Sequence, residues 1–216
     1  MTPDELLDAG AAELGLKLDV QTRQRLLAYV DLLLSWNRTH NLTAVRDPEQ
    51  IVSRHLLDSL SVLPYVPQGR VVDVGSGAGL PGIPLALARP DSAVTLLDSS
   101  QKKTAFMRHA CTQLGIVNAD VVRARAESWK PPAPFDAAIC RALGGLGVFA
   151  EQSAALIGEA GCLLAMKGLH PYEELAELPE TVTLEKVVEL HVPFLQANRR
   201  LVIMRRKASE LSSTEH

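Results

Sequence analysis

Apolar residues recur at two different spacings along this chain, and the change of spacing divides it in two. Up to about residue 66 they recur every three to four positions, which is the period of amphipathic helices. Beyond that point short apolar runs alternate with helical stretches, a pattern typical of a doubly wound parallel sheet. We therefore expect an α/β fold with an N-terminal helical extension at 1–66, a sheet domain at 67–207 and a disordered polar tail at 208–216.

Three helices are expected in the N-terminal part. Residues 2–5 read TPDE, a capping box with proline at the first helical position, and they start the first helix. Either Asp19 or Thr22 caps a second helix that carries leucines along one face. Asp47 starts a third helix, which we expect to continue to about Leu63.

Seven strands are expected in the sheet domain. They fall near 70–74, 93–97, 118–123, 135–140, 161–166, 183–191 and 200–206, with helices near 81–89, 100–114, 145–157 and 172–177. No long helix joins the last two strands, so we expect the final strand to run antiparallel to the others.

A glycine-rich turn connects the first strand to the helix that follows it, where residues 71–84 read VVDVGSGAGLPGIP. Glycine occupies every second position at Gly75, Gly77 and Gly79, so the backbone can take positive φ and approach a ligand closely. We expect unpaired N–H groups at the start of the helix to face the same space. The turn therefore predicts a site for a polar, nucleotide-like molecule.

Two cofactors compete for this turn. Gly77-Ala-Gly79-Leu-Pro-Gly82 satisfies the dinucleotide fingerprint, and Asp98 ends the next strand, where an acidic residue binds a ribose. The register argues against NAD, because Gly75 already closes the first strand after Asp73. Asp-x-Gly-x-Gly-x-Gly followed by an acidic strand end instead resembles the first motifs of class I S-adenosylmethionine methyltransferases. A turn without any ligand would not need three alternating glycines.

Composition narrows the function further. The formal net charge is −3 and aromatic residues make up 4%, so nucleic-acid binding would depend on a local basic patch rather than on base stacking. The three scattered cysteines suit neither a zinc site nor a disulfide framework, and no apolar run is long enough for a membrane span. We expect a cytoplasmic monomer without a bound metal and without membrane contact.

Three further segments carry a more specific resemblance. Residues 36–60 read WNRTHNLTAVRDPEQIVSRHLLDSL, residues 135–142 read FDAAICRA, and residues 165–168 read AMKG. Together with the glycine turn they closely resemble the RsmG family, also called GidB, over roughly residues 25–206. Members of that family are bacterial methyltransferases that modify guanine N7 in small-subunit (16S) ribosomal RNA. The resemblance implies a Rossmann-like, seven-stranded, mostly parallel sheet, S-adenosylmethionine as cofactor, and 16S ribosomal RNA or the small subunit as partner.

The resemblance also implies which residues bind the cofactor. These are Gly75, Gly77, Leu80, Asp98, Ala126, Glu127 and Arg141. The two carboxylate oxygens of Asp98 can accept both protons of a ribose diol, while main-chain groups around Ala126 can contact the adenine edge. The alternative for Asp98 is a helix N-cap, and for Glu127 it is a solvated loop carboxylate.

Methyl transfer to guanine N7 requires no general base, because N7 carries an in-plane lone pair and no proton. We therefore nominate no catalytic acid or base, and we expect alignment and exclusion of water to accelerate the reaction. Arg141 and Lys167 end the fourth and fifth strands, where open α/β sheets bind ligands, and either can donate to guanine O6. The alternative for Lys167 is a solvated surface lysine.

Residues from both ends of the chain are expected to contact RNA. They are Asn41, Arg54, Lys167, Arg199 and Arg200, with Arg38, Arg46 and His55 as further candidates. A turn residue is the alternative for Asn41, a core histidine for His55, and a charged strand edge for the basic cluster at 199–207. Family members often carry Arg-His or Arg-Tyr where this chain has Arg199-Arg200, so a guanidinium contact would replace a ring.

Three other functions remain open from the sequence. The first is a methyltransferase of the same fold that acts on a small molecule or a protein. The second is a NAD-binding oxidoreductase, and the third is a non-catalytic RNA-binding module on a methyltransferase fold. The intact glycine turn and Asp98 argue against the third.

Overall fold

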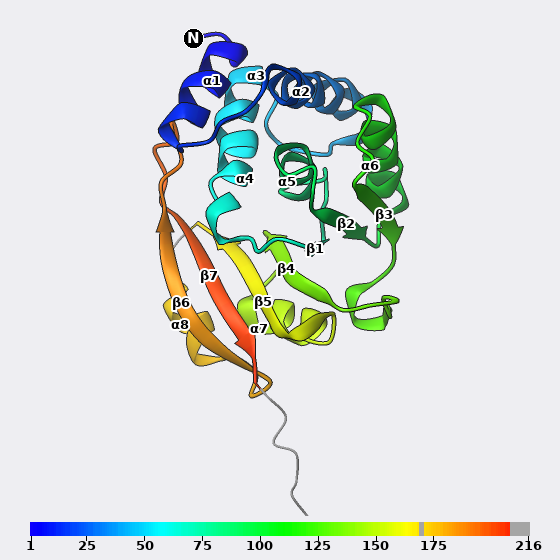
Figure 1. Ribbon diagram of the computed structural model, residues 1–216, viewed down its shortest axis with the longest axis vertical. Coiled ribbons are helices and arrows are strands. Elements are labelled where there is room, and N and C mark those ends of the chain that lie inside the picture. The colour runs from blue at the N-terminus through cyan, green and yellow to red at the C-terminus, as the bar shows by residue number, and fades with distance from the viewer. Residues whose placement is uncertain (169–170, 208–216) are drawn as a thin grey trace, which may run out of the picture.

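The molecule is built on one seven-stranded sheet with helices on both faces (Figure 1), and the computed structural model describes residues 1–168 and 171–207. The strands are β1 (Arg70–Val74), β2 (Ala93–Asp98), β3 (Ala119–Arg123), β4 (Phe135–Arg141), β5 (Ile157–Lys167), β6 (Val182–Leu190) and β7 (Arg199–Arg206). Their spatial order is β3-β2-β1-β4-β5-β7-β6, and only the two pairs formed by β7 are antiparallel. The predicted seven-stranded sheet with an antiparallel final strand is confirmed.

The N-terminal part is helical, as the apolar spacing predicts. It contains α1 (Pro3–Glu13), α2 (Val20–His40), α3 (Pro48–Ile51), the π-helical η1 (Val52–Leu57), α4 (Asp58–Leu60) and the 3₁₀ turn η2 (Leu63–Tyr65). Thr2 and Glu5 form the reciprocal capping box, which satisfies two backbone N–H groups at the start of α1. Asp19, rather than Thr22, caps α2 by accepting from the N–H of Thr22 at 2.6 Å.

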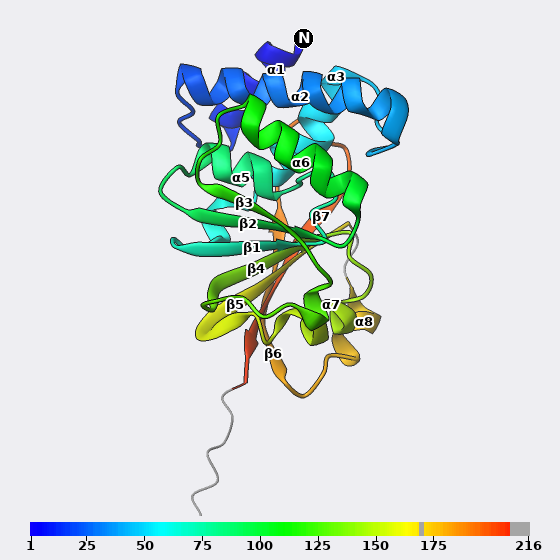
Figure 2. The ribbon, with the colours of Figure 1, turned by 90° about the vertical axis from the view of Figure 1, so that its right-hand side faces the viewer.

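The remaining helices follow the strands of the sheet. They are α5 (Gly82–Ala88), α6 (Gln101–Gln113), the 3₁₀ turn η3 (Ala126–Ser128), α7 (Leu146–Ser153) and α8 (Tyr172–Ala176). Figure 2 shows two layers, with α5, α6 and the N-terminal helices on one face of the sheet and α7 and α8 on the other. The carboxyl ends of the parallel strands therefore meet along one edge between these layers.

The N-terminal helices share a hydrophobic core with the sheet. Leu33 of α2 and Leu57 of η1 are fully buried in the same cluster as Phe106 of α6. The hydroxyl of Tyr29 donates at 2.7 Å to the carbonyl oxygen of Ala78, which ties α2 to the glycine turn. A second cluster fills the opposite face beneath α7. The N-terminal helices and the sheet thus pack as one unit. The predicted domain boundaries remain a prediction.

Two details differ from the predicted elements. The third helix is interrupted by the π-helical turn η1, in which the carbonyl oxygen of Arg54 accepts from the Arg141 side chain. Helix α7 ends at Ser153 instead of near 157, because β5 begins there by pairing Ile157 with Phe135. The predicted disordered tail at 208–216 lies outside the described residues. None of the described helices combines the length and the apolar character that a membrane span needs.

Candidate functional site

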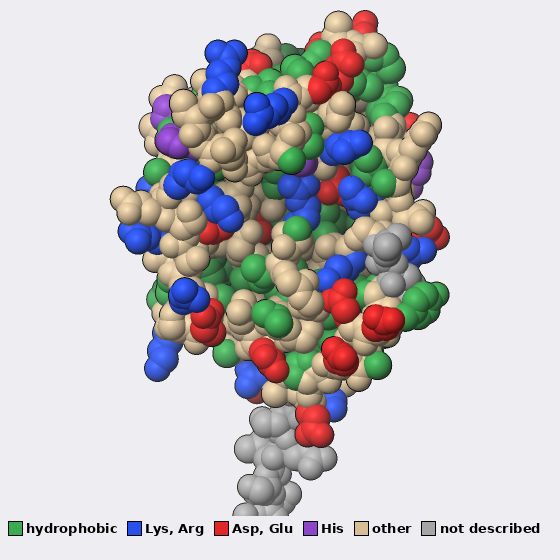
Figure 3. Space-filling view, turned by 180° about the vertical axis from the view of Figure 1, so that it is seen from behind, with side chains coloured by type: hydrophobic (Ala, Val, Ile, Leu, Met, Phe, Trp, Pro, Cys, Tyr) green, Lys and Arg blue, Asp and Glu red, His purple; other side chains and the backbone are tan. Residues whose placement is uncertain are grey.

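Two cavities open at the carboxyl ends of the parallel strands. The first has a volume of about 290 Å³ and is lined by Val74, Gly75, Leu97, Asp98, Ser99, Lys103, Ala124, Arg125, Ala126, Glu127, Ala142, Leu143 and Gln152. The second has a volume of about 430 Å³ and is lined by Val45, Arg54, His55, Asp58, Arg141, Ala142, Met166, Lys167, Gly168 and Arg199. Ala142, whose φ of 58° is rare outside glycine, lines both cavities, so they are neighbours. In Figure 3, most Lys and Arg side chains gather across the upper half of the face shown, above most of the acidic ones.

The glycine turn forms one wall of the first cavity. Gly75, Gly77 and Gly79 all have positive φ, at 70°, 60° and 82°, as their alternation predicts. The expectation of unpaired N–H groups is wrong, because most N–H groups of the turn donate to acceptors within the protein. For example, Gly75 and Ser76 donate to the carbonyl oxygen of Leu97 at 2.8 and 3.0 Å. The positive φ values therefore account for the glycines, and few N–H groups of the turn remain without a partner.

Asp98 lies in the first cavity with its carboxylate held in a fixed orientation. Its Oδ2 accepts from the N–H of Gly77 at 3.0 Å, and its Oδ1 accepts from the N–H of Ser100 at 2.8 Å. Lys103 adds an ion pair at 3.5 Å. Ser100 is the N-cap of α6, so Asp98 is not needed for that role. Since each carboxylate oxygen has two acceptor positions, Asp98 keeps capacity for hydroxyl donors.

The other predicted cofactor residues divide into two groups. Ala126 and Glu127 line the first cavity together with Gly75 and Asp98. Gly77, Leu80 and Arg141 do not line it. Gly77 contributes through its hydrogen bond to Asp98, and Leu80 is buried in the core under the turn. Arg141 lies in the second cavity, because its side chain points from the end of β4 toward η1.

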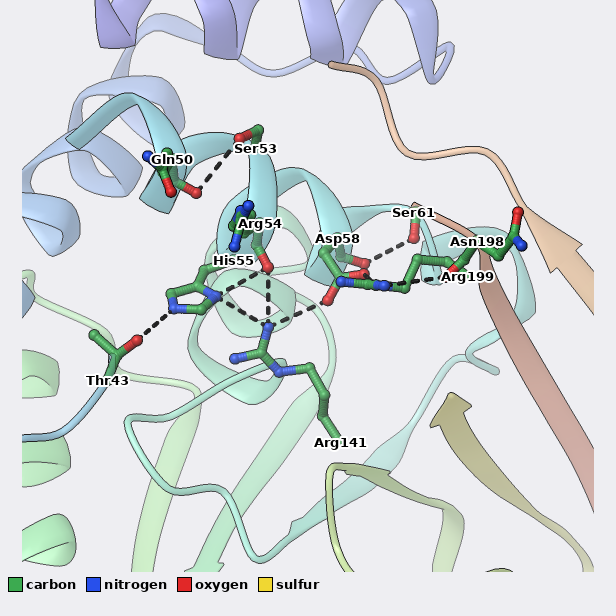
Figure 4. A network of polar contacts seen from close by, with 10 residues as sticks. All are labelled: Thr43, Gln50, Ser53, Arg54, His55, Asp58, Ser61, Arg141, Asn198 and Arg199. Carbon is green, nitrogen blue, oxygen red and sulfur yellow. Dashed lines mark hydrogen bonds and ion pairs between the residues drawn. The ribbon is translucent and has the colours of Figure 1, made fainter. Parts of the chain in front are cut away.

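A buried carboxylate, that of Asp58, organises the second cavity (Figure 4). Its Oδ2 accepts from Nη1 of Arg141 at 3.2 Å, and its Oδ1 accepts from Nε of Arg199 at 2.9 Å. The Asp58 side chain is only 3% exposed, whereas Arg141 and Arg199 are 21% and 25% exposed. One acid of the N-terminal helices therefore pairs with two arginines from different strands, and its burial strengthens these charge-assisted hydrogen bonds.

His55 connects this group to the loop after α2. Its Nδ1 lies 2.9 Å from the carbonyl oxygen of Arg54, and its Nε2 lies 2.8 Å from Oγ1 of Thr43. We assign the ring proton to Nδ1, since Arg54 then accepts and the Thr43 hydroxyl donates to Nε2. Burial, followed by the nearby positive charge of Arg141, lowers the pKa of His55 to about 4. His55 is therefore a neutral core histidine, the alternative that its apolar helix face predicts.

Asn37 fixes the loop that Thr43 belongs to. Its side-chain amide donates to the carbonyl oxygen of Thr43 at 2.8 Å and accepts from the N–H of the same residue at 3.0 Å. The asparagine and threonine of the 36–60 segment thus hold His55, which in turn lies beside Arg141. Asn41, predicted to contact RNA, is the C-cap of α2 with φ of 47°, and it lines neither cavity.

The predicted basic cluster at the C-terminus is divided by its ion pairs. Arg199 faces Asp58, while Arg200 approaches Glu189 at 3.8 Å and Arg205 pairs with Glu185. These ion pairs reduce the free positive charge along β7, so the cluster is not one continuous patch. Lys167 lines the second cavity but donates to both carboxylate oxygens of Glu174, at 3.0 and 2.7 Å.

Asp58 is the main residue that the sequence prediction missed. It follows Arg54 by one helical turn, where an acid and a base are neighbours on a helix. The signal was an acid within an otherwise buried helical stretch, since Leu56, Leu57 and Leu60 surround it. Lys103 and Arg125, which line the first cavity, were also missed, because each lies in an ordinary charged segment.

Sheet order and glycine turn together define the Rossmann-like fold of class I methyltransferases. A methyltransferase of this fold from Aquifex aeolicus, described as SAM-dependent, superposes with a TM-score of 0.54 at 20% identity over 74% of this chain and 94% of that chain. The sequence profile of the rRNA small subunit methyltransferase G family, GidB, matches residues 22–203, and the chain belongs to that family.

Two relatives show how closely the chain follows that family. Ribosomal RNA small subunit methyltransferase G of Methylobacillus flagellatus is 51% identical over 198 residues, which cover 92% of this chain and 96% of the relative. The protein of the same name from Pseudomonas paraeruginosa is 50% identical over 206 residues, which cover 95% and 96%. The prediction of a ribosomal RNA methyltransferase of this family is confirmed.

Proposed function

We propose that this protein transfers the methyl group of S-adenosylmethionine to N7 of a guanine in 16S ribosomal RNA. The observation that carries the proposal is that two different cavities share Ala142 in their linings. One contains an oriented acceptor, Asp98, and the other contains two arginines held by Asp58. A methyl donor bound in the first cavity and an anionic nucleotide bound in the second would have their reacting atoms close together near Ala142.

The first cavity suits the donor because of its acceptors and its backbone. Asp98 can accept from a ribose diol, and Gly75 presents bare backbone to the cavity. A Cβ at Gly75 would come within 2.7 Å of Leu143, which lines the same cavity. Ala126 and Glu127 line the same space. When bound, S-adenosylmethionine supplies an electrophilic methyl group.

The second cavity suits the target nucleotide because of its donors. Arg141 uses only Nη1 for its hydrogen bonds to the described residues, which leaves its Nε and Nη2 for a ligand. A guanine presents O6 and N7 as acceptors on one edge, and a donor at O6 leaves N7 free to attack. We assign this orienting role to Arg141. Lys167 can take part only after it leaves Glu174.

Phosphates of the RNA have a separate place to bind. A hollow of about 280 Å³ is lined by Leu34, Asn37, Arg38, Arg46 and Pro48, on the other side of the loop that borders the second cavity. Arg38, Arg46 and Arg54 are exposed, and none has an ion-pair partner within residues 1–168 and 171–207. Exposed unpaired arginines bind phosphates more readily than the paired arginines at the C-terminus.

The reaction requires the protein to orient the guanine and the methyl donor, and it requires no proton transfer. Guanine N7 has no proton to lose, and both nitrogens of His55 already have partners. The donor loses a positive charge as the guanine gains one, so little net charge must be stabilised. Alignment across Ala142 and removal of water are therefore the main contributions of the chain.

Labelled methyl transfer tests the proposal. Purified protein with methyl-labelled S-adenosylmethionine should label 16S but not 23S ribosomal RNA, and S-adenosylhomocysteine should stabilise the protein in a thermal-shift assay where NADH does not. Asp98→Asn should weaken S-adenosylhomocysteine binding, whereas Asp136→Asn, which changes an acid at the amino end of β4, is the matched control. Absence of label in 16S ribosomal RNA, both free and in assembled small subunits, would contradict the proposal.

The RNA surface needs its own comparison. Replacing Arg38 and Arg46 by glutamine should weaken RNA binding and flatten its dependence on salt, because two phosphate contacts are lost. The same change at Arg200 and Arg205, each of which faces a glutamate, is the control, and it should alter the salt slope less. An equal effect of both pairs would contradict the assignment of phosphates to the N-terminal hollow.

A further inference from the structure

Asp58 accepts hydrogen bonds from Arg141 and Arg199, two of the three arginines that line the second cavity. The three residues come from α4, the end of β4 and the start of β7, so the carboxylate joins the helical extension to two strands. Each oxygen serves a different guanidinium group. The two arginines thereby have fixed positions relative to one another although each is held at one side only.

The contacts leave the outer part of each guanidinium group open. Arg199 uses Nε for Asp58 and Nη1 for the carbonyl oxygen of Asn198, while its Nη2 has no hydrogen bond to the described residues. Arg141 likewise keeps Nε and Nη2. Arg141, Arg199 and Asp58 together carry a net charge of +1. His55 beside them adds no charge, because it is neutral.

The same nitrogen of Arg141 has a second support in η1. Its Nη1 also donates to the carbonyl oxygen of Arg54 at 3.2 Å and lies 3.3 Å from Nδ1 of His55. The π-helical turn η1 places that carbonyl toward the cavity. Without Asp58, two guanidinium groups of like charge would face one cavity with no acid between them, and each is long enough to turn toward water.

We propose that Asp58 is a positioning residue for methyl transfer, which holds Arg141 and Arg199 so that their free N–H groups converge on the target nucleotide. Asp58 does not touch the nucleotide itself. The inference rests on the proposed function, since the nucleotide it positions is the one methylated at the junction of the cavities. It explains why a buried acid is maintained beside a site for an anionic substrate, where it otherwise weakens attraction.

Single-turnover methylation of 16S ribosomal RNA separates this role from a structural one. Asp58→Asn should lower the single-turnover rate by about 30- to 100-fold, as expected for misaligned reactants, and change the Kd of S-adenosylhomocysteine by less than about twofold. Asp58→Glu keeps the charge but shifts it by one methylene, so it should recover part of the lost rate. Glu49→Gln, an exposed acid on α3, is the charge control and should leave the rate unchanged.

A double-mutant cycle gives the second readout. In a background with Arg141→Met and Arg199→Met, Asp58→Asn should have almost no further effect on the rate, because its partners are absent. A full additional loss in that background would show a structural role and overturn the proposal. Parent-like activity of Asp58→Asn in an active preparation would also overturn it, whereas an inactive parent protein would instead contradict the proposed function.

If Asp58→Asn does not fold, Asp58→Glu, which keeps the charge, tests the proposal instead. If Asp58→Glu unfolds like the parent but transfers methyl at least about fivefold more slowly, the positioning role is supported. If Asp58→Glu unfolds like the parent and is fully active, the carboxylate is needed only for folding, and the proposal is wrong.

Discussion

Replacing His55 by glutamine is expected to remove a large part of the acid sensitivity of this fold. His55 is 9% exposed, and burial together with Arg141 lowers its pKa from the ordinary 6.5 to about 4. Between these values the unfolded chain binds a proton that the folded chain excludes, so stability is present above pH 6.5 and is lost as the pH falls toward 4. At 1.36 kcal/mol for each pH unit, the loss is roughly 3 kcal/mol.

Urea unfolding of the parent and of His55→Gln at several pH values between 7.5 and 4 measures this loss. Glutamine keeps an amide within reach of Thr43 but has no proton to bind in this range. The free energy of unfolding of the parent, minus that of the variant, should fall by about 3 kcal/mol from pH 7.5 to pH 4. Titrations common to both proteins cancel in this difference. A difference that stays constant with pH would refute the assignment of a buried neutral histidine.

Three further variants test the glycine turn and its surroundings. Gly82→Ala should destabilise the fold by roughly 1–3 kcal/mol in urea unfolding, because the added Cβ would meet Leu96 and, at 2.8 Å, Oδ2 of Asp73. Tyr29→Phe should cost about 1 kcal/mol in the same assay, since the buried carbonyl oxygen of Ala78 loses its donor. Burial raises the pKa of Asp73 to about 7 from 3.8, so its contribution to stability is complete below 3.8 and is lost as the pH rises through 7. Asp73→Asn should therefore gain about 2–3 kcal/mol relative to the parent between pH 5 and pH 7, and a parallel pH profile would contradict it.

Local signals in the sequence predict the elements of this fold well. The capping box at Thr2 and the caps at Asp19 and Asp47 depend on residues three positions apart, which a sequence displays directly. The strands follow from short apolar runs that both layers of helices bury. The interruption of the third helix was not predictable in this way, because the carbonyl oxygen of Arg54 finds its donor in Arg141, 87 residues later.

The first cavity was predicted more completely than the second. Gly75, Asp98, Ala126 and Glu127 each lie at or shortly after the end of a strand, and the carboxyl ends of neighbouring strands meet at one edge. In the second cavity the roles depend on side-chain pairs that the fold creates. Lys167 is occupied by Glu174 from α8, which no spacing in the sequence indicates.

Asp58 is the clearest example of a role that the sequence alone does not predict. Its partners lie 83 and 141 residues away, so its role appears only once the helical extension packs against the ends of β4 and β7. The specific segment at 36–60 is thereby explained in physical terms. It holds the loop after α2, His55 and Asp58 against two arginines, and it supplies the wall that a bare methyltransferase sheet lacks.

Nucleoside mass mapping of ribosomal RNA tests the central proposal most directly. Small-subunit RNA from bacteria that lack their own enzyme of this family would be incubated with the protein and S-adenosylmethionine, digested and analysed for 7-methylguanosine. The proposed function predicts that 7-methylguanosine appears at a single guanine of 16S ribosomal RNA, and that Arg141→Ala, although folded, loses most of it. Methylation at another atom or in another RNA, or activity of Arg141→Ala within about threefold of the parent, would contradict the positions assigned to donor and guanine.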